Sequence, residues 1–213
     1  MLDLSVFKEP LGIMRVFQFI FAFLAFSCTT SYTNELNFNC KAENGTIGSY
    51  AYPIEYPFDV KISQSQVCAN SKFTLYADFS FEAHFFFITG LLSILYAIGI
   101  SVVYALIEDV YKNDKRFPFL DFGATVILAV FWLSGSAAWA YGVSGLKSVT
   151  DPTTIKTTMS LDCCTISRSG FTRLTISIIF GFLNFFLWAS DLWFVYKETA
   201  WFQSLSNQAP SGV

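Results

Sequence analysis

Residues 85–107 read FFFITGLLSILYAIGISVVYALI, a run without a single charged side chain. A helix needs about 20 mostly apolar residues to cross the hydrocarbon core of a bilayer, and this run is long enough. Three further stretches have the same character, although each holds a few polar side chains. The sequence therefore predicts four transmembrane helices, at residues 11–32, 85–107, 119–145 and 174–196.

The composition of the whole chain also indicates a membrane protein. Of the 213 residues, 54% are hydrophobic and 14% are charged, whereas an ordinary soluble domain has about 25% charged residues. The 25 Phe residues exceed what the core of a soluble domain of this size can hide from water. The high hydrophobic content excludes a disordered chain. The net charge of −3 does not provide the excess of positive charge that binding of nucleic acid requires. We therefore expect an all-α membrane protein, folded as a four-helix bundle.

The first predicted helix has a competing interpretation. Residues 16–28 resemble the apolar part of a signal peptide, and Ala25-Phe26-Ser27 resembles a cleavage site. The apolar stretch continues in both directions without a strong break, so we expect a retained transmembrane helix rather than a cleaved one.

Cysteines and a glycosylation sequon favour one orientation in the membrane. The segments at residues 33–84 and 147–173, expected to be loops, hold four candidate disulfide cysteines: Cys40, Cys68, Cys163 and Cys164. Disulfides persist on the oxidising side of a membrane, and the sequon at Asn44 lies in the longer of these loops. The density of Lys and Arg favours the same orientation slightly. We therefore expect luminal or extracellular loops, with cytosolic ends at residues 1–10 and 202–213.

The spacing of the cysteines predicts one disulfide. Cys40 and Cys68 enclose 27 residues of one loop and are expected to pair. Cys163 and Cys164 are adjacent, which leaves two alternatives: each bonds to another cysteine, or the two form a strained vicinal bridge. Cys28 falls inside the first predicted helix, where it fits as a small packing residue.

Small residues indicate where the predicted helices pack. Membrane helices associate through close packing of small side chains, because burial from lipid offers little hydrophobic gain. The predicted packing residues are Ser93, Ala97, Ser101, Ala105, Ser134, Ala138, Gly142 and Gly181. We expect these positions to hold a tight bundle, whose remaining Phe- and Leu-rich faces meet lipid or other copies of the chain.

Polar side chains within the predicted helices are costly in lipid and therefore suggest a role. Arg15, Asp121 and Asp191 lie near the same ends of their helices, and Asn184 precedes Asp191 by one heptad. Either these side chains pair between helices, or they line an ion or proton pathway. We favour pairing of Arg15 with Asp121 or Asp191, because a conduction path needs polar residues at all depths.

No arrangement of residues indicates catalysis. The single His, His84, has no partners for a metal site, and the chain has neither a glycine-rich phosphate loop nor a nucleophile beside a base in a known pattern. We therefore expect neither enzyme activity nor a cofactor. The residues Leu106, Tyr111 and Lys115 match a loose pattern proposed for cholesterol contact.

Several motifs resemble the synaptophysin family. Residues 8–12 (KEPLG) lead into the Phe-rich first helix, and residues 54–58 read IEYPF. The most specific stretch, residues 181–199, contains GFLN, then LW, then LWFVYKET. The resemblance covers about residues 7–201 and implies a tetraspan domain of the MARVEL type at residues 11–201, with cytosolic termini.

This resemblance also implies a function. Synaptophysin-like proteins are non-enzymatic proteins of synaptic or secretory vesicles, which form oligomers, associate with cholesterol and bind SNARE proteins of the synaptobrevin type, thereby modulating exocytosis. The chain departs from the family in two ways: the spacing from Cys40 to Asn44 is longer, and Cys163 and Cys164 are adjacent in the sequence where the family separates its two cysteines. The family's disulfide pairing is therefore not carried over. Roles of the long tail repeat are not carried over to Gln203–Val213 either.

Two other classes of membrane protein compete with this interpretation. An ion channel or transporter, formed by an oligomer of four-helix bundles, is the alternative function, and Asp121 and Asp191 are its best support. A junction protein of the claudin or connexin type fits less well, because the cysteine patterns of those proteins are absent from the predicted loops.

Overall fold

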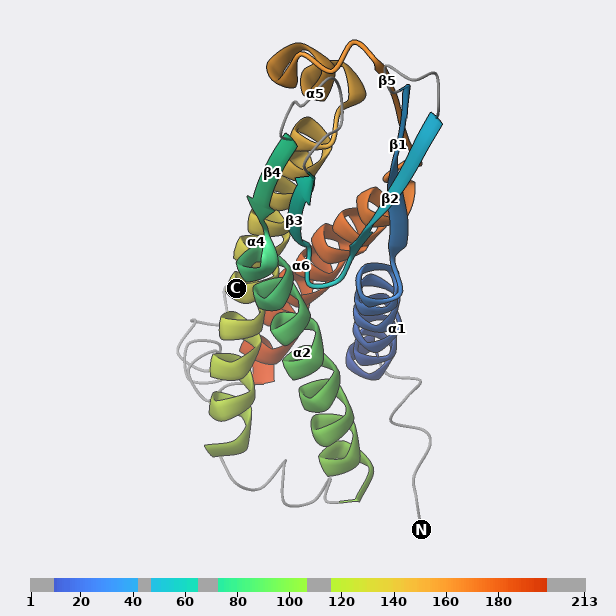
Figure 1. Ribbon diagram of the computed structural model, residues 1–213. Coiled ribbons are helices and arrows are strands. Elements are labelled where there is room, and N and C mark those ends of the chain that lie inside the picture. The colour runs from blue at the N-terminus through green and yellow to red at the C-terminus, as the bar shows by residue number, and fades with distance from the viewer. Residues whose placement is uncertain (1–9, 42–46, 65–72, 107–115, 199–213) are drawn as a thin grey trace, which may run out of the picture. The chain divides into compact units, whose positions relative to one another are not determined.

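The computed structural model describes residues 10–41, 47–64, 73–106 and 116–198 (Figure 1). Four long helices occupy the predicted apolar segments, and each is long and apolar enough to cross a membrane. They are α1 (Pro10–Thr30), α2 (Ser80–Leu106), α4 (Arg116–Val149) and α6 (Thr172–Glu198).

The helix ends differ from the predicted ends by a few residues. Helix α2 begins at Ser80, before the purely apolar run, because the Asp78 carboxylate accepts hydrogen bonds from the Ser80 N–H at 3.0 Å and from its hydroxyl at 2.5 Å. A side chain that satisfies the first free N–H groups allows a helix to start among polar residues. Helix α4 continues to Val149, past the predicted end at residue 145.

The chain divides into two compact units, which are described separately. The first unit comprises the helical segments within Met1–Ala25, Ile88–Ser136 and Ile179–Val213. The second unit comprises Phe26–Phe87 and Ala137–Ile178, and among the described residues it contains every strand and the short helix α5 (Pro152–Met159).

The segments expected to be loops contain β-strands, so the fold is mostly helical, as expected from the four long helices, but not all-α. The strands are β1 (Thr33–Lys41), β2 (Ile47–Glu55), β3 (Asp59–Gln64), β4 (Phe73–Asp78) and β5 (Cys164–Arg168). Strand β1 lies between β2 and β5 in one antiparallel sheet, and β3 pairs with β4 (Figure 1). Strand β1 forms because buried and more exposed residues alternate along it: Leu36, Phe38 and Cys40 are buried and the residues between them are not. Successive side chains of a strand point to opposite faces, so this alternation suits a strand with one buried face.

Aromatic side chains form the core of the second unit. The Phe38 ring of β1 contacts the Phe73 ring of β4 at 5.1 Å between centroids. The Phe58 ring lies 5.1 Å from the ring of Trp139, whose indole N–H donates to the Ser177 hydroxyl at 3.0 Å. Burial of large rings, with the indole N–H satisfied, contributes strongly to stability.

Helix α5 has a polar cap at its first turn. The Asp151 carboxylate accepts a hydrogen bond from the Thr154 N–H at 3.1 Å, and the Thr153 hydroxyl donates to the same oxygen. These hydrogen bonds, with that from the Thr153 hydroxyl as the largest contribution, hold the pKa of Asp151 below its usual range. The cap fixes where α5 begins, directly after α4.

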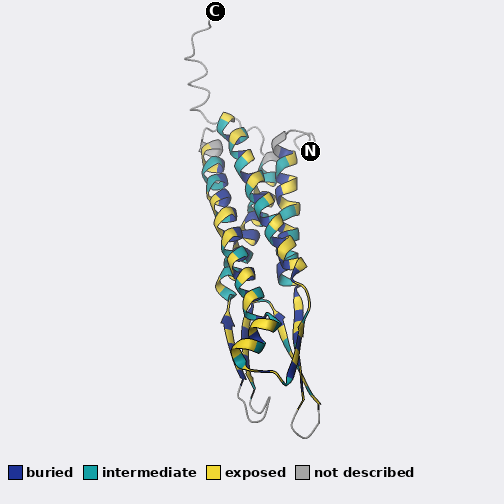
Figure 2. Cartoon of the chain, turned by 90° about the horizontal axis from the view of Figure 1, so that it is seen from above, coloured by how far each residue is buried: buried dark blue, intermediate teal, exposed yellow. Residues whose placement is uncertain are grey.

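The long helices carry exposed apolar side chains along their length. Figure 2 shows exposed positions recurring on each of them. Examples are Phe23 in α1, Leu95 in α2, Val130 in α4 and Phe186 in α6, each more than half exposed. Large apolar side chains repeated on one surface need an apolar solvent, so these faces are suited to lipid.

Candidate functional site: a buried charge cluster

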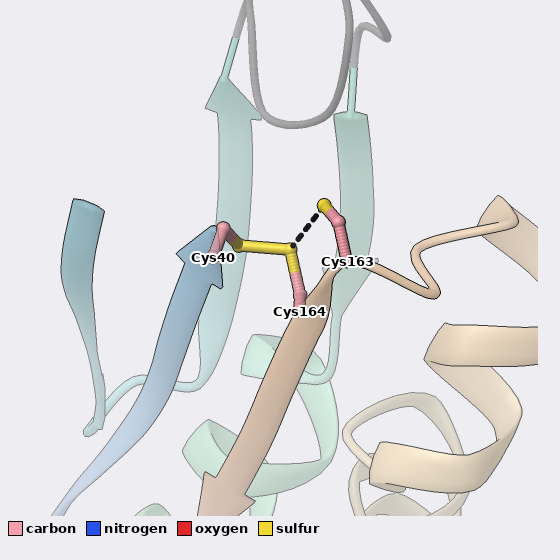
Figure 3. The surroundings of a disulfide bond; sticks show 3 residues. All are labelled: Cys40, Cys163 and Cys164. Carbon is pink, nitrogen blue, oxygen red and sulfur yellow. Dashed lines mark hydrogen bonds between the residues drawn. A yellow bond between two sulfur atoms is a disulfide. The ribbon is translucent and has the colours of Figure 1, made fainter. Parts of the chain in front are cut away.

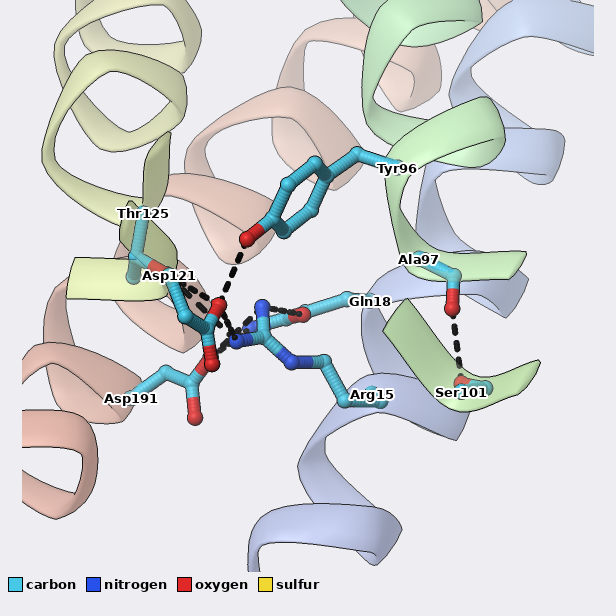
Figure 4. Close-up of polar contacts among 8 residues, drawn as sticks. All are labelled: Arg15, Gln18, Tyr96, Ala97, Ser101, Asp121, Thr125 and Asp191. Atoms are coloured by element: carbon cyan, nitrogen blue, oxygen red, sulfur yellow. Dashed lines mark hydrogen bonds and ion pairs between the residues drawn. The ribbon is translucent and has the colours of Figure 1, made fainter. Parts of the chain in front are cut away.

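Arg15 lies at the centre of a polar cluster inside the first unit (Figure 4). Its Nη2 donates to Asp121 Oδ1 at 2.9 Å, and its Nη1 lies 2.9 Å from Asp191 Oδ2. All three side chains are at most 2% exposed. Charge-assisted hydrogen bonds of this length are among the stronger polar contacts in proteins. One guanidinium on α1 therefore ties together carboxylates from α4 and α6.

Gln18 links α1 to α6 a second time. Its side-chain oxygen accepts from Arg15 Nη1 at 3.2 Å, and its Nε2 donates to Asp191 Oδ2 at 3.1 Å. Its backbone carbonyl accepts from Asn184 Nδ2 at 3.3 Å. Gln18 follows Arg15 by three residues, so both side chains lie on one face of α1. That face meets the side of α6 that carries Asn184 and Asp191.

Helix α2 joins the cluster through Tyr96. The Tyr96 hydroxyl donates to Asp121 Oδ1 at 2.6 Å, and the Thr125 hydroxyl of α4 lies 3.5 Å from the same oxygen. Arg15 Nη2 also reaches the Thr125 hydroxyl, at 3.4 Å. With Tyr96 the cluster contains side chains from all four long helices.

An aromatic ring lies against the guanidinium. The central carbon of the Arg15 guanidinium lies 5.0 Å from the centroid of the Trp188 ring and 5.7 Å from that of Tyr96. A cation over an aromatic face is stabilised by the ring quadrupole, most of all where water is excluded. Trp188 is fully buried and lies on α6 between Asn184 and Asp191, so it closes the cluster on that side.

The predicted packing residues occupy a range of environments. Ser93, Ala97, Gly142 and Gly181 are buried, while Ser101 and Ala138 are half-buried. The side chain of Ala105 lies outside the described residues. Ser134 is exposed and donates to the Val130 carbonyl at 2.7 Å, so it does not lie in the packed interior of the described residues. The interior face of α4 is set instead by the large side chains Trp132 and Trp139, both fully buried.

The disulfide differs from the predicted one. Cys40 is bonded to Cys164, with an S–S distance of 2.01 Å (Figure 3). The predicted Cys40–Cys68 pairing and the vicinal Cys163–Cys164 alternative are therefore both wrong. The reason is strand register, since antiparallel pairing of β1 with β5 places Cys40 directly opposite Cys164. The bond joins the two segments that were expected to be separate loops.

Three sulfur atoms lie close together around this bond. The Sγ atoms of Cys40, Cys163 and Cys164 are within 4.8 Å of one another. Metal binding requires thiolates, and Cys40 and Cys164 are oxidised to a disulfide, so this group does not form a metal centre. Cys28 is a free, half-buried thiol in α1.

Several predicted sites fall outside the part of the chain that the structure describes. These are the sequon residue Asn44, the cysteine Cys68, and Tyr111 and Lys115 of the cholesterol pattern, together with the side chain of Leu106 at the end of α2.

Sequence reasoning also missed some members of the cluster. Gln18 could have been found from its spacing to Arg15, since the two lie on one helical face. Thr125 and Trp188 could have been found in the same way, since Thr125 follows Asp121 by four residues and Trp188 precedes Asp191 by three. Tyr96 gave no signal, because a tyrosine is an ordinary residue of a membrane helix.

Four helices of membrane-spanning length and composition, held together in their interior by a buried ion-pair cluster, define a multi-pass membrane protein. The family model for MARVEL, described as a membrane-associating domain, matches residues 6–194. The chain belongs to the MARVEL family. Family membership therefore shows that the protein associates with membranes.

Proposed function

We propose that this protein is a non-enzymatic component of secretory or synaptic vesicle membranes, where it forms oligomers and binds a SNARE protein of the synaptobrevin type. Membership of the MARVEL family supports the membrane part of this proposal. The motifs at residues 8–12, 54–58 and 181–199, which resemble the synaptophysin family, support the vesicle and SNARE parts. The SNARE partner rests on that resemblance alone.

The observation that carries the proposal is the apolar outer surface of the long helices. Leu120, Ile127 and Val130 of α4 are each more than half exposed, although they lie within a helix long enough to span a bilayer. A single chain leaves such side chains for lipid, cholesterol or further copies to cover. This arrangement suits a protein whose activity is to organise a membrane and its neighbours.

The proposed orientation has cytosolic termini, with residues 33–84 and 147–173 on the luminal side. The Cys40–Cys164 bond supports it, since both cysteines belong to these segments and disulfides persist in oxidising compartments. Both segments belong to the second unit, so the bond cross-links two segments of one compact body. Glycosylation at Asn44 belongs to the same proposal.

The ion-channel alternative has weaker support. Its best evidence was Asp121 and Asp191, and both are buried and bonded to Arg15 rather than lining an open path. Conductance of the purified protein in a planar bilayer, abolished by Asp191→Asn, would bring that alternative to first place.

Localisation combined with affinity capture tests the proposed function. The tagged chain, expressed in secretory cells, is expected to co-purify with small vesicles, to yield cross-linked oligomers and to capture a synaptobrevin-type SNARE. Capture of a plasma-membrane SNARE of the syntaxin type serves as the specificity control. Residence in another membrane, with no SNARE captured above that control, would refute the vesicle proposal and leave membrane association intact.

A further inference from the structure

The buried cluster around Arg15 is not electrically balanced when both carboxyls are ionised. Among the described residues its charged or titratable members are Arg15 on α1, Tyr96 on α2, Asp121 on α4 and Asp191 on α6. One guanidinium faces two carboxylates. The Tyr96 phenol is neutral, because it keeps its proton and donates a hydrogen bond to Asp121. The sum over these four described side chains is one net negative charge. A net charge without a counter-charge is strongly unfavourable in a buried apolar setting.

The two carboxyl groups have different surroundings. Asp121 Oδ1 is the acceptor shared by Arg15, Tyr96 and Thr125. Asp191 Oδ2 is held by Arg15 and Gln18, whereas Asp191 Oδ1 is buried and has no hydrogen-bond partner among the described residues. In Figure 4 one oxygen of Asp191 points away from the guanidinium. Asp191 is therefore the member whose charge is least compensated.

A missing positive charge can be supplied by a metal cation or by a proton, and the geometry favours the proton. A metal cation needs several oxygen ligands at once. The other buried side-chain oxygen of α6 without a described partner is Asn184 Oδ1. Asn184 and Asp191 are seven residues apart, which is about 10 Å along a helix, too far for both to hold one ion. A proton needs a single oxygen.

We propose that the cluster is a proton-binding site, in which Asp191 holds one exchangeable proton on Oδ1. Binding breaks one O–H bond of a hydronium ion in the surrounding water and forms one O–H bond at Asp191 Oδ1, so the net charge of the described cluster changes from −1 to zero. Asp121 keeps its contact with Arg15 at 2.9 Å. Proton binding by this cluster would be a property of the first unit, and it does not depend on vesicle residence or on SNARE binding.

Infrared spectroscopy of the full-length protein in lipid vesicles, with aspartate labelled by ¹³C at its side-chain carboxyl, tests the proposal. Wild type is expected to show a protonated aspartic acid band at neutral pH, which shifts with the label and disappears as the pH is raised. Asp191→Asn and Asp121→Asn are both expected to abolish the band, because either leaves one carboxylate to balance Arg15. Asp78→Asn, which removes an exposed carboxylate, serves as the matched control and keeps the band.

Three results would overturn the proposal. The first is wild-type protein without a protonated aspartic acid band at any pH at which it stays folded, a measurement that needs no variant. The second is a band that survives in folded Asp191→Asn. The third is stoichiometric binding of radioactive sodium ion that depends on Asp191, which would assign an alkali cation in place of the proton.

Discussion

Arg15 and Asp191 lie 2.9 Å apart, although one belongs to the first long helix and the other to the last. Both side chains are at most 1% exposed. A buried ion pair adds little net stability in many proteins, because desolvation of the charges offsets their attraction. Loss of one partner is nevertheless strongly destabilising, since it leaves the other charge buried alone. The pair therefore specifies that α1 and α6 meet.

Arg15→Gln is expected to destabilise the protein by about 3–5 kcal/mol at neutral pH, because it removes the cation shared by two buried carboxyls. Unfolding of the purified protein in detergent measures the effect. Arg173→Gln is the matched control, since Arg173 is exposed and donates to the Ser31 hydroxyl at 2.7 Å, and it should cost less than about 1 kcal/mol. Equal losses for the two variants would mean that the buried cluster has no special role in folding.

Tyr96→Phe removes only the hydroxyl that donates to Asp121 at 2.6 Å. A hydrogen bond to a charged group contributes about 1.5–3 kcal/mol, so we expect a loss of that size. Tyr141→Phe, at a position that is 71% exposed, should change the free energy of unfolding by less than about 0.5 kcal/mol. If both variants unfold like wild type, α2 is not anchored through this contact.

The double variant Cys40→Ser, Cys164→Ser is expected to lose about 2–5 kcal/mol, because the bond closes a long loop in the unfolded chain. Cys28→Ser removes a thiol that is in no disulfide and serves as the control. Peptide mapping without reduction should recover Cys40 linked to Cys164. Recovery of Cys40 linked to Cys68 would contradict the pairing of β1 with β5.

The helices could be predicted from the sequence because each is decided locally. A run such as residues 85–107 is apolar enough to span a bilayer whatever the rest of the chain does. Arg15, Asp121 and Asp191 stood out for the same reason, since charges within such runs are rare. What local sequence could not supply was the partner from α2, Tyr96, because nothing near it in the sequence marks it as a partner of Asp121.

The strands were missed because their evidence is split along the chain. The alternation of Leu36, Phe38 and Cys40 with polar residues is visible in the sequence, but it does not say which strand pairs with β1. The partner β5 lies more than a hundred residues further on, and only the register between them places Cys164 opposite Cys40. The expected disulfide within residues 33–84, between Cys40 and Cys68, is wrong because Cys40 is bonded to Cys164.

The cap of α5 is expected to weaken in acid. Hydrogen bonds from Thr153 and Thr154 hold the pKa of Asp151 below its usual range, so its contribution to stability is present above the unfolded-state pKa and is lost as the pH falls through the folded-state pKa. Hydrogen exchange of the α5 amides, corrected for intrinsic rates, should therefore speed up at acidic pH. Asp151→Asn keeps a capping side chain without the charge and should remove this pH dependence, and a dependence that persists in that variant would contradict the assignment.

Substitution of two glycines of α4, Gly123 and Gly145, distinguishes the effect of helix propensity from the effect of close packing. A Cβ built at Gly145 lies 2.5 Å from Cε1 and 2.6 Å from Cζ of Phe79, whereas a Cβ at Gly123 meets no described atom within 4 Å. Ala in a helix interior is favoured over Gly by about 0.5–1 kcal/mol. Gly123→Ala should therefore keep or raise stability, while Gly145→Ala should lose about 1–3 kcal/mol because the Phe79 ring must move. Unfolding of both variants in the same detergent measures the difference, and equal stability would show that Phe79 does not pack against Gly145.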